Sequence, residues 1–385
     1  MNSRSLPVFA ALFAFVLLAL GFAVGYGFHT EQSEPQAVSR LPRPQATPKP
    51  EPAKAPKVKG LKASPDNRTL AFSAVFENGT RASRFLLDVK TQKWSATETP
   101  RGWQDYTMQW SEDGSKILFD REKIPHSVED TTAGLYQERV QNAKSAAPKS
   151  SGATSLTPKG ALPAGEKSYA GFWTPDNSLV VKTRREPKSL FQMGNRARLL
   201  DRARGTFLQN RAVRENGKTA FYVVRDAGDK LKKYALFRLD SSNRTRQLTP
   251  LQSDVEWCYI AEDARWMVVC RKSDDEENWN WTLWRVTPSR ALQVKTARVP
   301  LDVIAVFWSP DRKRILGASG KSLWTISIPS LQSRRLGTRQ TWNADDATWL
   351  GKDAAIVAAD GILWKVDVPS GNAQQLWKFP AEYWK

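Results

Sequence analysis

An internal repeat constrains the fold of this chain more than any other feature of its sequence. Each unit has an apolar stretch that usually ends in an aromatic residue, a tight turn rich in Pro, Asp, Asn and Gly, and a second apolar stretch. Turn residues of this kind between β-prone runs predict a hairpin. The clearest copies begin at Trp110, Trp173 and Trp308, and weaker copies begin at Ser64, Arg214, Ala261 and Trp349.

A second column of aromatic residues repeats in register with the hairpins. After each hairpin comes a short strand-like run with an aromatic residue at a matching place. Aromatic residues make up only 10% of the chain, so seven matching positions are not a chance event. A further run closes most units, so we expect four antiparallel strands per repeat, with the aromatic residues packed between neighbouring units. The column consists of Phe85, Tyr136, Phe191, Phe237, Trp284, Trp324 and Trp364.

The spacing of the repeats predicts the architecture. Units of four short strands that recur roughly every 40–48 residues are typical of propeller blades. We therefore expect an all-β protein, a β-propeller of about seven four-stranded blades over residues 61–385, with six or eight blades as alternatives. One interval is longer, and its stretch from Lys144 to Lys167 is rich in Ser, Ala, Pro and Gly. We interpret that stretch as a loop inserted in the second blade.

The turn and strand motifs together resemble a known repeat family. Turns such as Ser309-Pro310-Asp311, followed by strands such as Leu363-Trp364-Lys365-Val366-Asp367, are similar to the repeats of TolB-type propellers and of related WD40-like proteins. The resemblance covers residues 58–385 and implies an extracytoplasmic protein that binds other macromolecules. TolB has an α/β domain before its propeller, whereas this chain has an apolar run and a proline-rich segment. We therefore do not carry over the role of TolB in its envelope complex.

The N-terminal part of the chain predicts a membrane anchor and a tether. Residues Leu6 to Phe28 are uncharged and almost wholly apolar, and such a run makes about 34 Å of helix, enough to cross a hydrocarbon core of roughly 30 Å. We expect residues 1–29 to be an uncleaved single-pass anchor, with a cleaved signal peptide as the alternative. Arg4 places the N-terminus in the cytoplasm and the propeller on the periplasmic or extracellular side. Residues 30–60 contain seven prolines and predict an extended linker.

Histidine and cysteine are scarce, which excludes several kinds of site. The chain has two of each, whereas a zinc site needs about four Cys, His or carboxylate ligands and a Ser-His-Asp triad needs a histidine beside its nucleophile. His29 lies next to the apolar run, and His126 stands alone. The sequence therefore identifies no catalytic, metal-binding or cofactor-binding residue.

The net charge of +19 points to anionic partners. Eight Lys or Arg residues against two acidic ones occupy the span from Lys182 to Arg204, which is one hypothesis for an anion-binding face. An ordinary solvated loop is the alternative, and the frequency of charge runs on protein surfaces favours it. Aromatic residues are sparse in this span, which disfavours single-stranded nucleic acid. The candidate anion-binding residues are Arg184, Arg185, Arg196, Arg198, Arg202 and Arg204.

The two cysteines flank the turn of the fifth hairpin. Cys258 and Cys270 lie at similar distances from the turn centre, so we expect them to face each other across adjacent strands. Opposite Cα atoms in an antiparallel pair lie about 4.5–5.5 Å apart, which suits a disulfide. The expected extracytoplasmic side would permit oxidation. Two buried free thiols are an equal alternative.

Three classes of function remain open from the sequence. The leading hypothesis is a membrane-anchored, extracytoplasmic, non-enzymatic scaffold for a protein or envelope component, with an anionic surface or glycan as a further candidate partner. The runner-up is a carbohydrate-active hydrolase or lyase with carboxylates in the propeller channel. The third is a sensor with a small ligand in that channel. Two carboxylates about 5–10 Å apart in a deep pocket would favour the enzyme.

Overall fold

A computed structural model describes most of the C-terminal four-fifths of the chain. Residues Pro52–Lys385 form a compact unit, and within it the described part is all-β apart from one 3-10 turn, η2 (Ala381–Tyr383). The described residues are 54–76, 81–123, 134–141, 148–150, 152–156, 162, 168–183, 186–194, 197–203, 205–227, 233–242, 244–273, 278–300, 305–318, 322–337 and 342–384.

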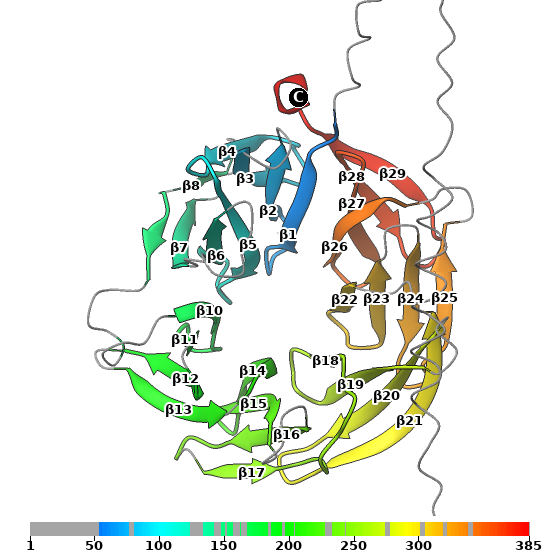
Figure 1. Cartoon of the computed structure of the whole chain (residues 1–385). Helices are drawn as coiled ribbons and strands as arrows, with labels where there is room; N and C mark the ends of the chain where they lie inside the picture. The colour runs from blue at the N-terminus through cyan, green and yellow to red at the C-terminus, as the bar shows by residue number, and fades with distance from the viewer. Residues whose placement is uncertain are drawn as a thin grey trace, which may run out of the picture. The chain divides into compact units, whose positions relative to one another are not determined.

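Seven antiparallel sheets surround a common centre and form the blades of a propeller (Figure 1). The strands of each blade follow one another in chain order from the centre outward. The innermost strands are β1 (Lys57–Ala63), β5 (Trp103–Trp110), β10 (Ser168–Trp173), β14 (Phe207–Glu215), β18 (Trp257–Ile260), β22 (Ala305–Trp308) and β26 (Ala344–Leu350). The second strands are β2 (Thr69–Phe76), β6 (Lys116–Lys123), β11 (Leu179–Thr183), β15 (Lys218–Asp226), β19 (Trp266–Lys272), β23 (Arg314–Ala318) and β27 (Ala354–Ala359).

The outer half of each blade completes the sheet, and the predicted seven-bladed propeller is confirmed. The third strands are β3 (Arg81–Asp88), β7 (Gly134–Gln141), β12 (Lys188–Met193), β16 (Tyr234–Leu239), β20 (Asn278–Val286), β24 (Leu323–Ser327) and β28 (Ile362–Asp367). The outermost strands are β4 (Trp94–Glu98), β8 (Lys149–Ser150) with β9 (Thr154–Ser155), β13 (Arg198–Ala203), β17 (Thr245–Gln247), β21 (Ala291–Pro300), β25 (Ser333–Leu336) and β29 (Ala373–Lys378).

The repeated polar turn joins the innermost strand of a blade to the second strand. In blade 2 the Ser111 hydroxyl donates to Asp113 Oδ1 at 2.6 Å and accepts the backbone N–H of Lys116 at 2.9 Å. The next residue, Gly114, has a φ of 68°, in the left-handed region that favours glycine and asparagine. The motif is therefore structural, because its polar atoms are consumed within the turn.

The aromatic column lies where the sequence predicts it. All seven residues fall on third strands, and their rings enter the apolar cores between blades. Phe85 stacks on Phe72 of the neighbouring strand with ring centroids 5.3 Å apart. Trp284 packs in the core between blades 4 and 5. Each blade thus buries its apolar face only against its neighbours, which explains why the repeats depend on one another for stability.

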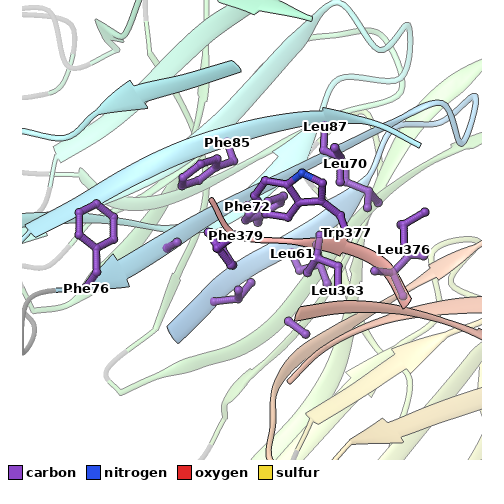
Figure 2. Packing of buried hydrophobic residues seen from close by; sticks show 14 residues of the cluster. Leu61, Leu70, Phe72, Phe76, Phe85, Leu87, Leu363, Leu376, Trp377 and Phe379 are labelled. Carbon is purple, nitrogen blue, oxygen red and sulfur yellow. The ribbon is translucent and has the colours of Figure 1, made fainter. Parts of the chain in front are cut away.

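Ring closure between blades 7 and 1 rests on side chains (Figure 2). Each terminal blade is built from its own four consecutive strands, so no strand is exchanged between the ends of the ring. Phe379, which follows β29, lies with its ring centroid 6.0 Å from that of Phe72 and 5.3 Å from that of Phe85. Two backbone N–H groups of β1 donate to the carboxylates of Asp345 and Asp346 at 3.1 and 2.9 Å.

Three boundaries differ from the sequence predictions or lie outside the described residues. Strand β1 begins at Lys57, inside the predicted linker of residues 30–60. The stretch predicted as an inserted loop contains β8 and β9, which both pair with β7 and together make a broken outer strand of blade 2. The predicted anchor at residues 1–29 lies outside the described residues. In the part of the chain that the structure describes, no helix is long and apolar enough to span a membrane.

Candidate functional site in the central channel

Charged side chains of non-neighbouring blades influence one another electrostatically across the centre of the ring. Lys62 lies on β1 of blade 1, and Arg211 lies on β14 of blade 4. The charge of Arg211 acts on the pKa of the Lys62 amine, as do the charges of Asp346 and Glu262. Blades 1 and 4 lie across the ring from each other (Figure 1), so the electrostatic influence of Arg211 on Lys62 acts across the centre of the ring.

Burial lowers the pKa of each cation in this space. The pKa of Lys62 lies below its ordinary value because the amine is desolvated, an effect that Asp346 partly offsets. Desolvation also lowers the pKa of Arg211. It lowers the pKa of Lys182, on β11 of blade 3, to about 8, with Asp120 opposing the shift and Arg211 adding to it. The three blades thus hold desolvated cations close enough to repel one another, and a bound anion would relieve both effects.

The cations differ in how well the protein satisfies them. Lys62 Nζ lies 4.6 Å from the centroid of the Phe307 ring, a cation–π contact. Arg312, on the turn after β22, forms an ion pair with Glu262 at 2.9 Å. Arg211 and Arg312 each have a buried Nε without a hydrogen-bond partner among the described residues. An unsatisfied buried donor is costly, and Arg211, unlike Arg312, has no ion pair among the described residues. Arg211 therefore has more to gain than Arg312 from an external acceptor.

The carboxylates near the channel are already engaged. Asp346 Oδ2 accepts the N–H of Leu61 at 2.9 Å, and its Oδ1 accepts the N–H of Ala347 at 2.8 Å. Glu262 is paired with Arg312. Within the described part of the chain, no three His, Cys, Asp or Glu side chains converge as metal ligands. The channel therefore offers hydrogen-bond donors and positive charge to a ligand.

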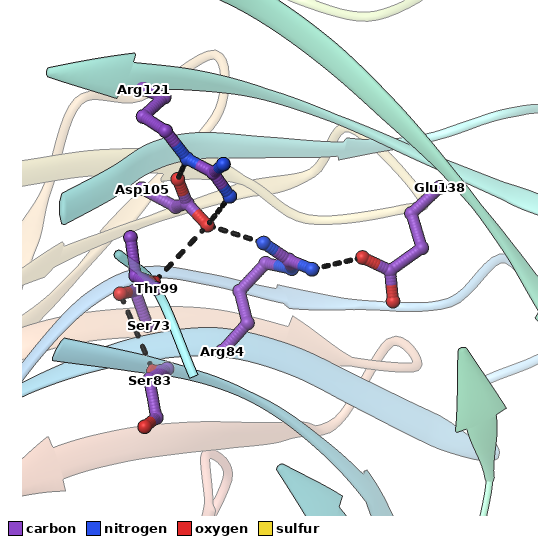
Figure 3. Close-up of polar contacts among 7 residues, drawn as sticks. All are labelled: Ser73, Ser83, Arg84, Thr99, Asp105, Arg121 and Glu138. Carbon is purple, nitrogen blue, oxygen red and sulfur yellow. Dashed lines mark hydrogen bonds and ion pairs between the residues drawn. The ribbon is translucent and has the colours of Figure 1, made fainter. Parts of the chain in front are cut away.

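A second cluster of charges is sealed between blades 1 and 2 (Figure 3). Arg84 of β3 contacts the carboxylates of Asp105 and Glu138. Arg121 donates to Asp105 through Nε at 2.7 Å and Nη2 at 3.1 Å. The Asp105 and Glu138 side chains are 0% and 2% exposed. This cluster has no net charge and is buried, so its role is to hold blades 1 and 2 together and not to bind a ligand.

The predicted pairing of the two cysteines is wrong. The register places Cys258 opposite Val269, and Cys270 opposite Trp257. Because successive residues of a strand point to opposite faces, Cys258 packs between blades 4 and 5 while Cys270 packs between blades 5 and 6. Both are buried free thiols, and burial raises the pKa of each.

Two of the six candidate anion-binding arginines are described by the structure. Arg198 and Arg202 lie exposed on β13, the outer strand of blade 3. Arg198 donates to Gln192 Oε1 at 2.7 Å and to the backbone oxygen of Ser241 at 3.4 Å. They do not belong to the channel. The other four, Arg184, Arg185, Arg196 and Arg204, lie outside the described residues.

The channel cations were missed because no motif marks them. Lys62, Lys182 and Arg211 each lie within a strand-like run of the sequence, near other charged residues. For Lys62 and Arg211 the available signal was a charge on an innermost strand, which points toward the channel or a blade interface; Lys182 lies on the second strand of its blade and has no such signal. It could be read only with the strand order and register in hand.

The comparisons with known proteins concern the fold. No family model and no curated protein matches the chain. An oligogalacturonate lyase from Vibrio parahaemolyticus is similar in structure, with a TM-score of 0.57 and 10% identity over 86% of this chain and 92% of that chain. An oligogalacturonate lyase in complex with manganese has a TM-score of 0.54 and 13% identity, and the match covers 88% of this chain and 93% of that chain. A puromycin-hydrolysing peptidase from Mycobacterium tuberculosis has a TM-score of 0.53 and 13% identity, and the match covers 86% of this chain and 54% of that chain.

Likeness at these identities defines a class of fold and leaves the activity open. The protein is a seven-bladed, all-β propeller. Its architecture is that of the TolB-like and WD40-like propellers that its repeats resemble.

Proposed function

We propose that this propeller is a binding protein that holds a small anionic ligand in its central channel. The buried, unpartnered Nε of Arg211 carries the proposal, together with the electrostatic influence of Arg211 on Lys62 and Lys182. A guanidinium binds a carboxylate or phosphate through two parallel hydrogen bonds, which makes it the primary contact. The lysines add charge from two other blades.

The same proposal includes the location of the protein. The apolar run from Leu6 to Phe28 supports a membrane anchor, and Arg4 supports an extracytoplasmic propeller. A tethered propeller with a ligand in its channel combines the scaffold and sensor hypotheses. In that arrangement ligand occupancy changes the surface that a partner in the envelope would meet.

Isothermal titration of the full chain in a non-ionic detergent tests the binding function. We choose digalacturonate and inorganic phosphate as probes, because oligogalacturonate lyases are among the structural neighbours. Loss of one charge-assisted contact costs about 1.5–3 kcal/mol, so Arg211→Gln should weaken binding roughly 10- to 100-fold. Lys352→Gln, on an exposed turn of blade 7, is the matched control. Equal affinity for the two variants, or no binding of either probe, would refute the proposal.

A second candidate, a lyase that removes a proton beside a carboxylate, is favoured by Lys182. An amine with a pKa of about 8 is partly neutral near neutral pH and can accept a proton, while Arg211 can neutralise the substrate carboxylate. Incubation with trigalacturonate would then release an unsaturated product that absorbs ultraviolet light. Lys182→Met should abolish that product and retain binding. If the wild-type chain binds trigalacturonate without forming product, the lyase is excluded for this substrate.

A further inference from the structure

The outer strands of the blades carry an excess of cations. On the seven outermost strands nine residues are Lys or Arg and two are acidic, whereas the whole chain has 58 Lys and Arg against 39 Asp and Glu. The acidic pair is already used within the fold. Glu98 contacts Arg81, and Asp201 forms an ion pair with Arg225 at 2.6 Å. The rim of the propeller is therefore more basic than the chain as a whole.

Four of these cations lie on the outermost strands of consecutive blades, and we name this set the rim arc. Its members are Arg202 on β13, Arg246 on β17, Lys295 on β21 and Arg335 on β25, in blades 3, 4, 5 and 6. All four are exposed. Among the described residues none of them is joined by an ion pair to a carboxylate. The strands that carry the rim arc lie along the outer edge of the ring (Figure 1), and its four exposed side chains present positive charge to solvent.

We propose that the rim arc binds an acidic polysaccharide chain. The arc follows a convex edge, where a flat lipid surface can meet only part of it, whereas a flexible polyanion can follow every blade (Figure 1). Duplex DNA is too stiff to do so, since its persistence length is about 50 nm. Attraction between a row of exposed cations and a carboxylated or sulfated chain needs no pocket and no shaped groove.

The aromatic residues decide between a polysaccharide and single-stranded nucleic acid. Recognition of unpaired bases relies on exposed aromatic side chains that stack on them. Among the described residues, the strongly exposed large hydrophobic side chains are Leu251, Trp257, Leu292 and Val294. The one aromatic among them, Trp257, lies on the innermost strand of blade 5 and not on the rim. The rim arc therefore offers charge without stacking platforms, which suits a sugar chain.

Heparin binding by the full chain in a non-ionic detergent tests this proposal. One variant removes the rim arc: Arg202→Gln, Arg246→Gln, Lys295→Gln and Arg335→Gln. The control removes the same charge from exposed hairpin turns: Arg68→Gln, Arg265→Gln, Lys313→Gln and Lys352→Gln. Each exposed charge contact changes affinity about twofold, so the rim variant should bind roughly tenfold more weakly than the wild type. The control should stay within about twofold, because its charges lie away from the arc. Equal losses in the two variants would overturn the proposal.

Two further measurements separate the rim from other sites and partners. Arg211→Gln, which removes the proposed channel contact for small anions, should retain the binding of long heparin chains, and the length series that follows uses this variant. Loss of long-chain binding in Arg211→Gln would place the polysaccharide in the channel. Affinity should rise with chain length from a heparin disaccharide to a chain that spans several blades, because each blade adds a contact. A disaccharide that binds as tightly as the long chain would contradict the arc. Oligothymidylate that displaces heparin at a lower charge concentration would identify nucleic acid as the partner instead.

Discussion

Removal of Arg84 is the sharpest test of how the blades are fastened together. The guanidinium of Arg84 is 5% exposed and contacts Asp105 of blade 2 and Glu138 of the same blade. It also lies 4.2 Å from the centroid of the Phe119 ring. Arg84→Met keeps much of the side-chain length and removes the charge, so the perturbation is mainly electrostatic.

The expected cost follows from what the substitution leaves behind. Asp105 keeps its two hydrogen bonds from Arg121, whereas Glu138 loses its direct ion-pair partner among the described residues. Breaking a buried ion pair by deleting one partner costs about 3–5 kcal/mol of unfolding free energy, because the other charge stays buried. The double variant Arg84→Met with Glu138→Gln removes both charges, so it should recover most of that loss.

The pH dependence of the stability deficit in Arg84→Met is a second, independent test. Burial raises the pKa of Glu138 above its ordinary value of 4.5, and Arg84 opposes that rise. Without Arg84 the pKa in the folded state rises further, so the folded chain takes up a proton more readily than the unfolded chain. Stability from such a group is present below the unfolded pKa and is lost as pH rises through the folded pKa. The deficit of Arg84→Met should therefore be smallest near about pH 4 and largest near about pH 8.

Urea unfolding followed by tryptophan fluorescence at these two pH values measures both effects. The single variants, the double variant and the wild type form a double-mutant cycle whose coupling energy should be about 2–3 kcal/mol at the higher pH. A cost below about 1 kcal/mol for Arg84→Met, or no recovery in the double variant, would refute the account of this cluster as a buried fastener.

Three further predictions follow from buried groups. Phe379→Ala, in the aromatic cluster that closes the ring, should cost about 3–5 kcal/mol in thermal unfolding; a loss below about 1 kcal/mol would mean that closure does not depend on it. Affinity for the anionic probe should fall as pH rises through about 8, where Lys182 loses its proton, and Lys182→Met should remove that step; the same step in both chains would contradict the assignment. Cys258 and Cys270 should react with a thiol reagent only after unfolding, and a reductant should leave the melting temperature unchanged; a shift on reduction would reveal a disulfide.

The fold was predictable because its determinants are local and repeated. Residues such as Ser111 and Asp113 satisfy each other within one turn, so their chemistry is visible in the sequence. The aromatic positions recur because every blade must cover its neighbour, and all seven were placed on the correct strand. The seven-blade count follows from these columns.

The channel cations and the buried ion pairs between blades were not predictable because they depend on interactions between residues far apart in the sequence. Lys62 and Arg211 influence each other only when the ring closes. The sequence around either residue contains no motif that points to the other. The salt bridge between Arg84 and Glu138 joins residues 54 positions apart. The expectation that the two cysteines face each other was wrong because the register differs by one residue, and adjacent side chains of a strand point to opposite faces.

The most direct test of the central claim is a crystal structure of the full chain grown with sodium bromide. Anomalous scattering locates bromide without knowledge of the natural ligand. The proposed function predicts a bromide peak within hydrogen-bonding reach of the Arg211 guanidinium, on the channel side shared with Lys62, and its loss in Arg211→Gln. A channel free of bromide, in crystals that bind the ion elsewhere on the propeller, would contradict an anion-binding channel.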